Sequence, residues 1–449
     1  MKNRPWHKSF LATCLTILAI GVSIPVTTAK NDNSTSNKKG SSSLYEIFRH
    51  PETKYHPYVR WWWNGGHQSK AEITREIALL YQAGIGGVEI NPIQLPAGDT
   101  AGYPIHEWLS DDWIELVQTA VEECNKRGMV ADIIVGSGWP YGAEFLPRDQ
   151  QLQMLTVETF NLKGGSSLIL KRDEFLNNLK LHIGSAYDHP LKELLYLRLM
   201  PKHIDHFTEG LNLDSLASQE QIIIEAPEGE DYVLYCLVKV TGYMRVINGA
   251  PGAAGPVLNH FDRTAVEQFL NRMSDRMNSK MGKMGAGNLR AAFTDSFELE
   301  GANWDNDMLE EFERRRGYSL SPYLPYLIFK AGHMGNPISE KYGSEISPDV
   351  EQTIARVRND FDLTQRELFE ENFTIPYNNW CHRNGLLSRV QAYGRGLHPL
   401  EASMEIDIPE CETWHGHHHG HNFPDNTMAG RGYTPVNKYV SSAAHLSGK

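Results

Sequence analysis

The sequence alternates apolar strands with amphipathic helices between about residues 55 and 148, and this alternation restricts the fold more than any other feature. Strands are predicted at 58–63, 86–90 and 129–135, and helices at 70–82 and 111–127. Strands that are apolar at nearly every position are typical of a parallel sheet covered on both faces. For a chain of 449 residues, the pattern favours an α/β fold of the (β/α)8 TIM-barrel type over an open sheet.

The strand–helix pattern resumes in the second half of the chain. Its predicted elements are a helix at 262–281, strands at 289–295, 386–393 and 403–408, and a long helix at 350–382 interrupted near Pro376. We therefore assign residues 51–152 to barrel strands one to three and residues 251–449 to strands four to six. Residues 153–250 carry short strand-like runs separated by Gly, Asn and Asp turns, which predicts a mostly β insertion after strand three.

The six predicted strands are fewer than the eight that close a barrel of this type. An unclosed barrel exposes the edges of its first and last strands. We therefore expect the 449 residues to be a C-terminally truncated piece of a longer protein, ending before strands seven and eight, with little activity or stability alone. The alternative is that the insertion supplies the missing strands.

Residues 1–29 have the pattern of a cleaved secretory signal peptide. Basic residues at the start are followed by an apolar stretch at 10–26 and by the small residues Thr-Thr-Ala at 27–29. The apolar stretch is short and interrupted by polar residues, so it is a poor membrane span. We expect export to the periplasm or the extracellular space, with a lipid anchor at Cys14 as the lesser alternative, and a disordered tether over residues 30–50.

The acidic composition excludes one class of partner. The formal charge is −12, and removal of the signal peptide takes away the three basic residues Lys2, Arg4 and Lys8, leaving −15. Such a charge disfavours nucleic acid and suits neutral substrates. The remaining four cysteines have no close spacing, so we expect free and mostly buried thiols. Oligomeric state is not encoded in any pattern that we can interpret.

The predicted strands end in residues suited to binding a sugar. Trp62 and Asn64 end the first strand, Glu89 and Asn91 the second, and Trp139 follows the third. Aromatic faces pack against the C–H faces of sugar rings, and Asn and Glu form hydrogen bonds with hydroxyl groups. At least one residue of the tryptophan triplet at 61–63 is expected to fill the core instead, because strand side chains alternate between faces.

Carboxylates follow the later strands. Asp295 and Glu298 end the fourth strand, although Asp295 could instead cap the next helix. The fifth strand carries Gln391, and the sixth leads into Glu410, Glu412 and Trp414, which are further substrate-binding or catalytic candidates.

Two such carboxylates are what glycoside hydrolysis requires. One carboxylic acid protonates the leaving oxygen, and a carboxylate activates water from about 6.5–9.5 Å away in inverting enzymes. We choose Glu298 as the acid, with its pKa raised by aromatic surroundings and by Asp295. Glu410 is our first choice for the second catalytic residue, and Glu412 is the alternative; either could instead bind sugar hydroxyls or a metal.

Several motifs together resemble a known family. They occupy residues 59–64, 83–89, 294–298, 314–318, 322–325, 407–410 and 412–414. In this order they are similar to the large bacterial α-L-rhamnosidase-like glycoside hydrolases of polysaccharide-degrading bacteria. The resemblance implies a (β/α)8 barrel with added β-domains, cleavage of α-L-rhamnosyl or similar deoxysugar linkages in plant or microbial polysaccharides, inversion at the anomeric carbon, and a calcium ion near the bound sugar.

The resemblance leaves two function classes open. In the family, a further strand brings another acidic residue to the rim, and this sequence lacks that strand. The second catalytic carboxylate could therefore lie beyond the C-terminus. The chain is either a secreted glycosidase acting on an oligo- or polysaccharide, or a non-catalytic carbohydrate-binding relic of one.

The histidine cluster at 415–421 could hold a transition metal. The glycines within it disfavour a preformed tetrahedral site, so a solvent-facing loop is the simpler interpretation. Calcium prefers oxygen ligands and is not expected there.

Overall fold

The computed structural model describes residues 44–94, 104–287, 289–394, 398–412 and 428–449, although not the side chains at 428–436. The chain divides into two compact units, residues 1–50 and 51–449. The predicted signal peptide, most of the tether, Trp414 and the histidine cluster lie outside the described residues. No helix within the described ranges is long and apolar enough to cross a membrane.

In the first unit, helix α1 (Leu44–Arg49) occupies part of the segment that we expected to be a disordered tether. None of its residues is buried. Glu46 in its first turn and Arg49 in its last complement the helix dipole, which explains local helix formation without packing. The tether prediction is therefore wrong for these six residues.

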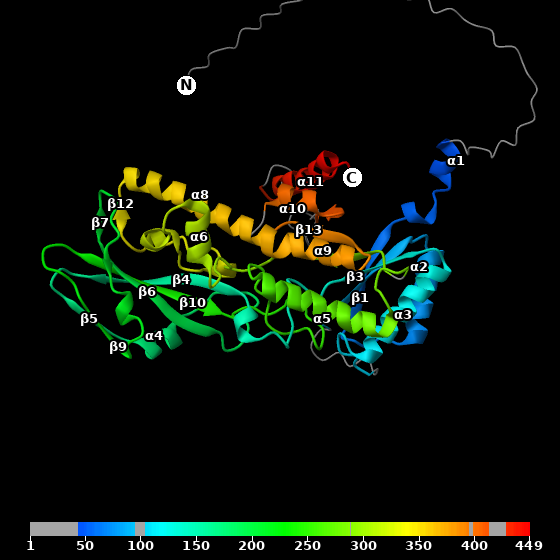
Figure 1. Cartoon of the computed structure of the whole chain (residues 1–449), viewed down its shortest axis with the longest axis horizontal. Coiled ribbons are helices and arrows are strands. Elements are labelled where there is room, and N and C mark those ends of the chain that lie inside the picture. Colours follow the sequence, from blue (N-terminus) through cyan, green and yellow to red (C-terminus); the bar gives the residue numbers. More distant parts are fainter. Residues whose placement is uncertain (1–43, 95–103, 288, 395–397, 413–427) are drawn as a thin grey trace, which may run out of the picture. The chain divides into compact units, whose positions relative to one another are not determined.

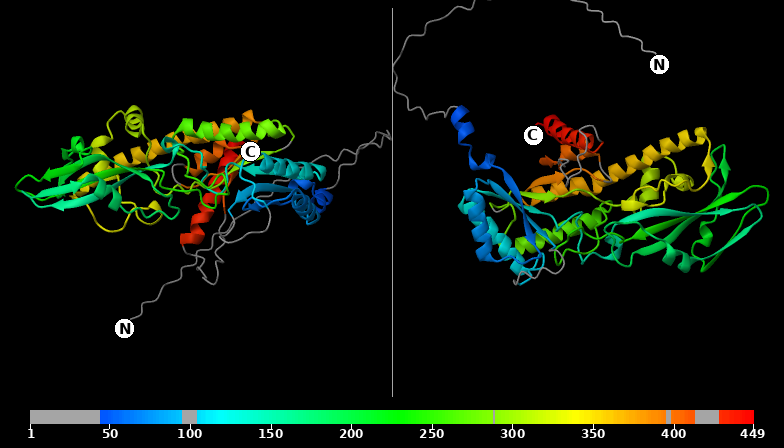
Figure 2. Two further views of the ribbon diagram at one scale, coloured as in Figure 1. Left: turned by 90° about the horizontal axis from the view of Figure 1, so that it is seen from below. Right: turned by 180° about the vertical axis from the view of Figure 1, so that it is seen from behind.

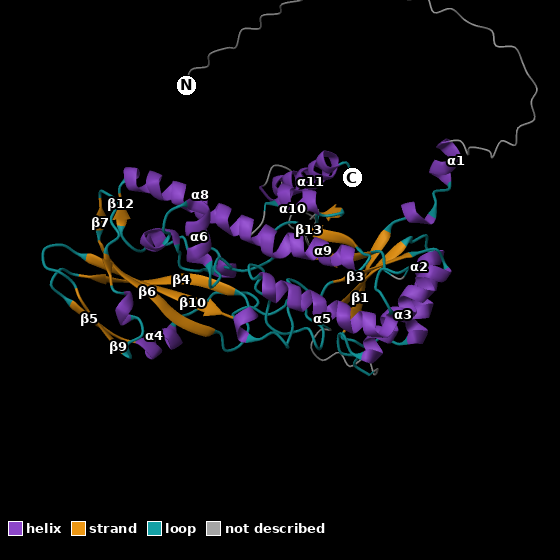
Figure 3. Cartoon of the chain, in the orientation of Figure 1, coloured by secondary structure: helices purple, strands orange, loops and turns teal. Residues whose placement is uncertain are grey.

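The second unit contains a parallel sheet of six strands (Figures 1 and 3). In spatial order they are β1 (Tyr58–Asn64), β2 (Gly87–Ile93), β3 (Val130–Ile134), β11 (Ala291–Thr294), β13 (Leu387–Gln391) and β14 (Ile408–Glu410). The order in space is the order in the chain, as expected for successive β–α units of a barrel-type fold. Strand β3 is followed by the insertion before the chain returns to the sheet at β11.

Helices separate most of these strands. Their bounds are α2 (Lys70–Gln82), α3 (Asp111–Lys126), α5 (Arg263–Met281), α6 (Met308–Arg316), α7 (Leu324–Leu327), α8 (Pro348–Phe369), α9 (Ile375–Arg383), α10 (Pro399–Glu405) and α11 (Met428–Ser447). Side chains of Ser69, Ser110 and Asp262 cap α2, α3 and α5 by accepting a hydrogen bond from the backbone three residues on. These caps fix where each helix begins.

One face of the sheet packs against the helices. Trp61 and Trp63 are buried on this face, and the Trp63 ring meets Trp113 of α3 edge-on at 6.3 Å. Trp62 points to the other face and is 52% exposed. The expectation that part of the tryptophan triplet fills the core is confirmed, and the alternation of strand side chains explains which residues do so.

The long predicted helix is interrupted as expected, but by a π-helical turn. Residues 370–374 form this turn between α8 and α9. Pro376 has no backbone N–H and cannot complete the regular ladder, so the hydrogen bonds shift to wider spacing there. The chain therefore continues in nearly the same direction into α9.

The predicted β-rich insertion forms sheets of its own. Strands β4 (Gln153–Leu162), β10 (Tyr232–Thr241), β6 (Leu191–Pro201) and β8 (Leu211–Asn212) make one antiparallel sheet, and β5 (Ser167–Lys171) pairs with β9 (Gln221–Glu225) next to α4 (Arg172–Asn178). Strand β7 (His203–Ile204) pairs with β12 (Glu345–Ile346), which precedes α8. Within the described residues, none of these strands joins the six-stranded sheet. Figure 2 shows the insertion and the six-stranded sheet at opposite ends of the second unit.

The sixth strand was predicted wrongly. Residues 399–405 form helix α10, and the strand begins only at Ile408. The alternation of Met404, Ile406 and Ile408 imitates a strand, but Pro399 in the first turn favours a helix. Ala402 and Ser403 are the buried residues of that helix.

All four cysteines of the second unit are free. Cys124, Cys236 and Cys381 are buried, and burial raises the pKa of Cys124 to about 12. Cys411 is half-buried. These thiols are unreactive core residues rather than nucleophiles.

Candidate active site

The face of the sheet that points away from α2 and α3 carries charged residues, one from nearly every strand. Arg60 of β1 lies opposite Glu89 of β2, which lies opposite Asp132 of β3. Arg389 of β13 and Glu410 of β14 complete the layer. These five residues line a cavity of about 390 Å³ together with Gln391, Cys411 and several apolar side chains.

Arg389 is the centre of this charged layer. Its guanidinium lies 2.8 Å from Asp132, 3.0 Å from Glu89 and 2.8 Å from Glu410. Two nitrogens bind the two oxygens of Glu410, at 2.9 and 3.0 Å. Burial favours a lower pKa for Arg389, but Glu410 and the other two carboxylates outweigh it and raise the pKa.

A second arginine connects this layer to the rim. Arg60 lies 3.0 Å from Glu89 and 3.0 Å from Asp295, which follows β11. Its guanidinium also stacks on one ring, Phe293, at 5.0 Å from the centroid, and Arg389 approaches the same ring at 4.8 Å. Phe293 thus separates two like charges while interacting favourably with both.

Carboxylates and hydroxyls gather where β11, β13 and β14 end. The Ser296 hydroxyl donates to Glu298 at 3.0 Å, and the Tyr393 hydroxyl donates to Glu412 at 2.5 Å. The Tyr393 hydroxyl also lies near Ser296. Asp295 lies close enough to Glu412 for the two charges to repel. We call Asp295, Ser296, Glu298, Tyr393 and Glu412 the rim cluster.

Backbone pairing holds the rim cluster together. The Phe297 amide donates to the Tyr393 carbonyl at 2.9 Å, and Phe297 forms an isolated parallel bridge with Gly394. Gly394 has φ of +128°, and a Cβ built there would lie 2.1 Å from the Phe297 carbonyl oxygen. Only glycine therefore allows the two chain segments to approach this closely.

The rim carboxylates differ in electrostatic environment. Burial raises the pKa of Asp295 to about 6, although Arg60 opposes the shift. Burial also raises the pKa of Glu410, and Arg389 opposes that shift. The pKa of Tyr393 is raised by burial and by its hydrogen bond to Glu412, so this residue stays a neutral donor. The site therefore contains a carboxyl group poised to be protonated near neutral pH beside carboxylates with hydrogen-bonded oxygens.

The other predicted sugar-binding residues occupy varied positions. Trp62 and Asn64 are exposed on the same face as Arg60. Asn91 is buried and donates to Glu89 at 3.1 Å. Gln391 is buried, and within the described residues its side-chain carbonyl oxygen has no hydrogen-bond partner.

Trp139 is set apart from these residues. It is half-buried, precedes a cis proline, and bridges Ile247 of the insertion through its backbone. The structure therefore brings Glu89, Asn91, Asp295 and Gln391 to one face of the sheet, while Trp139 belongs to a neighbouring loop.

Sequence reasoning missed the two arginines and Tyr393. Arg60 and Arg389 each interrupt an apolar strand, and Asp132 does the same in β3. A charge inside a buried strand requires an opposite charge nearby, so these interruptions signalled a paired layer that we did not recognise.

Calcium is implied by the family resemblance alone. Within the described residues, no three Asp, Glu, His or Cys side chains converge as metal ligands. Asp295 faces Arg60, and Glu410 faces Arg389, so these carboxylates are already neutralised by side-chain cations. Calcium therefore stays a prediction of the family resemblance.

A comparison with family models decides the assignment. The model described as alpha-L-rhamnosidase matches residues 49–180 and 214–449. The chain belongs to the alpha-L-rhamnosidase family. This result confirms the resemblance drawn from the sequence motifs, and it makes the rim cluster a site within a family of glycosidases.

Two relatives extend this assignment. The chain is 25% identical over 435 residues to a protein of Formosa agariphila named "Putative beta-glucuronidase", covering 91% of this chain and 34% of that one. The solved structure of a rhamnosidase from Novosphingobium sp. PP1Y has the same fold over 82% of this chain and 49% of its own length, with a TM-score of 0.55 and 16% identity. The chain thus spans about a third of the curated relative and half of the solved rhamnosidase.

Proposed function

We propose that this chain carries the acid–base site of an exported glycosidase that cleaves α-L-rhamnosyl or similar deoxysugar linkages in plant or microbial polysaccharides, with inversion. The observation that carries the proposal is the rim cluster of a chain of the alpha-L-rhamnosidase family, in which the Ser296 hydroxyl donates to Glu298 and the Tyr393 hydroxyl donates to Glu412. We also propose that the six parallel strands belong to a (β/α)8 barrel, whose catalytic groups lie at the carboxyl ends of its strands.

In this proposal, Glu298 is the general acid. It follows the end of β11, is half-buried, and its carboxylate is oriented by the Ser296 hydroxyl. Asp295, whose pKa burial raises to about 6, lies three residues earlier. Glu298 would transfer its proton to the glycosidic oxygen as the bond to the anomeric carbon breaks.

Glu412 is the better candidate for the second carboxylate. Both oxygens of Glu410 are bound by the Arg389 guanidinium, so neither is free to accept a proton from water. Glu412 receives one neutral hydrogen bond from Tyr393. It would remove a proton from the attacking water, while Glu410 would keep Arg389 in position beneath the sugar.

The remaining residues would bind the substrate. Trp62 offers an exposed indole face to a sugar ring, and the free amide oxygen of Gln391 can accept from a hydroxyl. The substrate of the relative named as a glucuronidase is a second possibility for the same carboxylate site. Nitrophenyl α-L-rhamnoside and nitrophenyl β-glucuronide should therefore be compared directly.

The test is hydrolysis of phenyl α-L-rhamnoside, whose leaving group needs a proton, by the wild-type chain and by Glu298→Gln, with Glu313→Gln as a control. Glu313 is an exposed glutamate of α6 outside the rim cluster. We expect the rhamnoside to be cleaved, with a loss of about 10²- to 10⁴-fold in Glu298→Gln and no loss in the control. Equal and negligible rates for the wild type and Glu298→Gln would leave a carbohydrate-binding protein without catalysis, and equal substantial rates would show that Glu298 is not the acid.

A further inference from the structure

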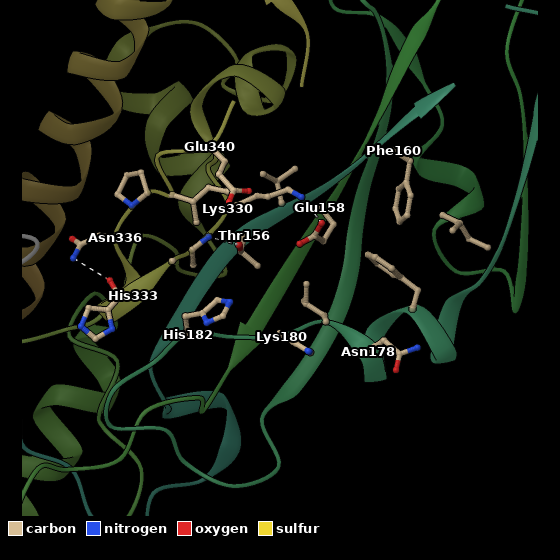
Figure 4. Close-up of a pocket in the computed structure, with 18 of the residues that line it drawn as sticks. Thr156, Glu158, Phe160, Asn178, Lys180, His182, Lys330, His333, Asn336 and Glu340 are labelled. Atoms are coloured by element: carbon tan, nitrogen blue, oxygen red, sulfur yellow. Dashed lines mark hydrogen bonds and ion pairs between the residues drawn. The ribbon is translucent and has the colours of Figure 1, made fainter. Parts of the chain in front are cut away.

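A second large cavity lies in the insertion. Its volume is about 1200 Å³, slightly above the range of about 300–1,000 Å³ that is typical of small-molecule sites. Strand β4 forms one wall, β5 and α4 form another, and the segment at 330–340 closes the third side (Figure 4). None of the rim cluster residues lines it.

The lining combines an aromatic and aliphatic floor with a polar edge. Phe160 of β4 and Phe175 of α4 meet edge-on at 6.0 Å, and both are half-buried. Lys330 reaches across to Glu158 at 2.6 Å, so this charge pair is already satisfied. Figure 4 shows His182 and His333 entering from different segments of the wall.

Two imidazoles of the cavity are available to a ligand. His182 and His333 are exposed, and within the described part of the chain neither side chain forms a hydrogen bond or an ion pair. Aromatic rings that accept C–H faces, surrounded by hydrogen-bonding groups, suit a ligand that is apolar on one face and rich in hydroxyls at its edges. A saccharide has this chemistry, and a purely apolar ligand would leave the polar edge unsatisfied.

The cavity walls are joined to the loop that follows Glu298. The Glu300 carboxylate accepts a hydrogen bond at 2.6 Å from the amide of Gly184, two residues after His182. Gly335, in the opposite wall, packs so closely that an added Cβ would lie 2.2 Å from the Gly301 nitrogen.

A third connection fixes the strand that forms the remaining wall. The side chain of Asn303 accepts from the Leu155 amide at 2.7 Å and donates to the Leu155 carbonyl at 3.0 Å. Residues 300–303, directly after the proposed general acid, therefore contact β4, the loop after α4 that carries His182, and the segment at 330–340. A ligand in the cavity would be positioned by the same loop that carries Glu298.

We propose that this cavity binds a saccharide segment of the substrate other than the sugar that is cleaved. The identity of the ligand rests on the proposed function, whereas the existence of the cavity is independent of it. Its role is to hold a polymer by a second contact, which increases the local concentration of cleavable linkages near the rim cluster.

The test is calorimetric titration of the full chain with a tetrasaccharide of α-linked L-rhamnose. Glu298→Gln serves as the background for all titrations, so that no probe is consumed. Phe175→Ala and His182→Ala remove one floor residue and one edge residue. His206→Ala is the matched control, because His206 is an exposed histidine of the insertion that does not line the cavity.

We expect the dissociation constant to increase at least tenfold in Phe175→Ala and about threefold in His182→Ala, since these correspond to the loss of one stacking contact and one hydrogen bond. His206→Ala should bind like the background. His182 is exposed, so His182→Ala keeps the test valid if Phe175→Ala fails to fold.

Two results would overturn the inference. One is no binding of the tetrasaccharide at about 10 mM, a concentration high enough to detect a weak site. The other is binding whose dissociation constant neither cavity variant changes. Failure of the proposed function looks different. If the wild type hydrolyses no rhamnoside but the cavity variants still weaken binding, the cavity stands as a saccharide site and only the catalytic proposal fails.

Discussion

His260 makes the stability of the site depend on pH in a way that can be calculated. Its ring is fully buried among Tyr141, Phe297, Phe369 and Phe373, and Phe297 precedes the proposed acid Glu298. One ring nitrogen lies 2.8 Å from the Leu258 carbonyl. Burial lowers the pKa of His260 from 6.5 to about 4.

A depressed histidine pKa costs stability in acid. Between pH 6.5 and 4 the unfolded chain binds a proton at His260 and the folded chain does not, so the free energy of unfolding falls as the pH falls through this window. The shift of about 2.5 pKa units corresponds to roughly 3 kcal/mol once the pH is below 4. Above pH 6.5 this contribution vanishes.

The variant His260→Phe removes the titrating group and keeps an aromatic ring in the pocket. Urea denaturation at pH 7 and pH 4.5 should show that the wild type loses about 2–3 kcal/mol more than the variant over this interval. His206→Phe, an exposed control, should retain the wild-type dependence. An identical loss in the wild type and His260→Phe would refute the assignment of a buried neutral imidazole.

Four further substitutions test the packing and charges of the sheet and of the site. Arg389→Gln should lower the free energy of unfolding by about 3–5 kcal/mol, because the buried carboxylates of Glu89 and Asp132 and the half-buried Glu410 lose their shared cation. Chemical denaturation measures this free energy, and a change under about 1 kcal/mol would contradict the prediction. Gly394→Ala should separate the chain segments beside Glu298 and lower the kcat for rhamnoside hydrolysis more than it changes the KM. An unchanged kcat would show that the contact is dispensable. Trp63→Ala should lower the free energy of unfolding by about 3–5 kcal/mol because it truncates a buried aromatic side chain. Trp62→Ala, on the exposed face, should lower it by about 0.5 kcal/mol or less. Equal melting temperatures of the two variants would show that the buried and exposed faces of β1 are misassigned.

Local patterns predicted the strands and helices of the sheet well. The apolar strands at 58–63 and 129–135 and the helix at 70–82 agree with the structure within one or two residues. The strands are short apolar runs, and the helix has a clear helical period with Ser69 as its capping residue. The strand prediction at 403–408 was wrong because, in a short segment, three alternating apolar residues fit both the period of a strand and the period of a helix.

The candidate site was predictable only in part. Asp295, Glu298 and Glu412 could be found because they directly follow strands, where parallel sheets gather functional groups. The pairing of Glu410 with Arg389 depends on the register of β13 and β14, which no local pattern reveals. Tyr393 could not be found either, since its contact with Glu412 joins the segments that follow β13 and β14, which no local pattern brings together.

The central claim is that Glu298 donates the proton to the leaving group. The most direct measurement compares kcat/KM of the wild type and Glu298→Gln on phenyl and dinitrophenyl α-L-rhamnosides, since the dinitrophenolate leaves without needing a proton. The account predicts a large loss in Glu298→Gln on the phenyl rhamnoside and a loss at least about tenfold smaller on the dinitrophenyl one. Equal losses on both substrates would contradict it.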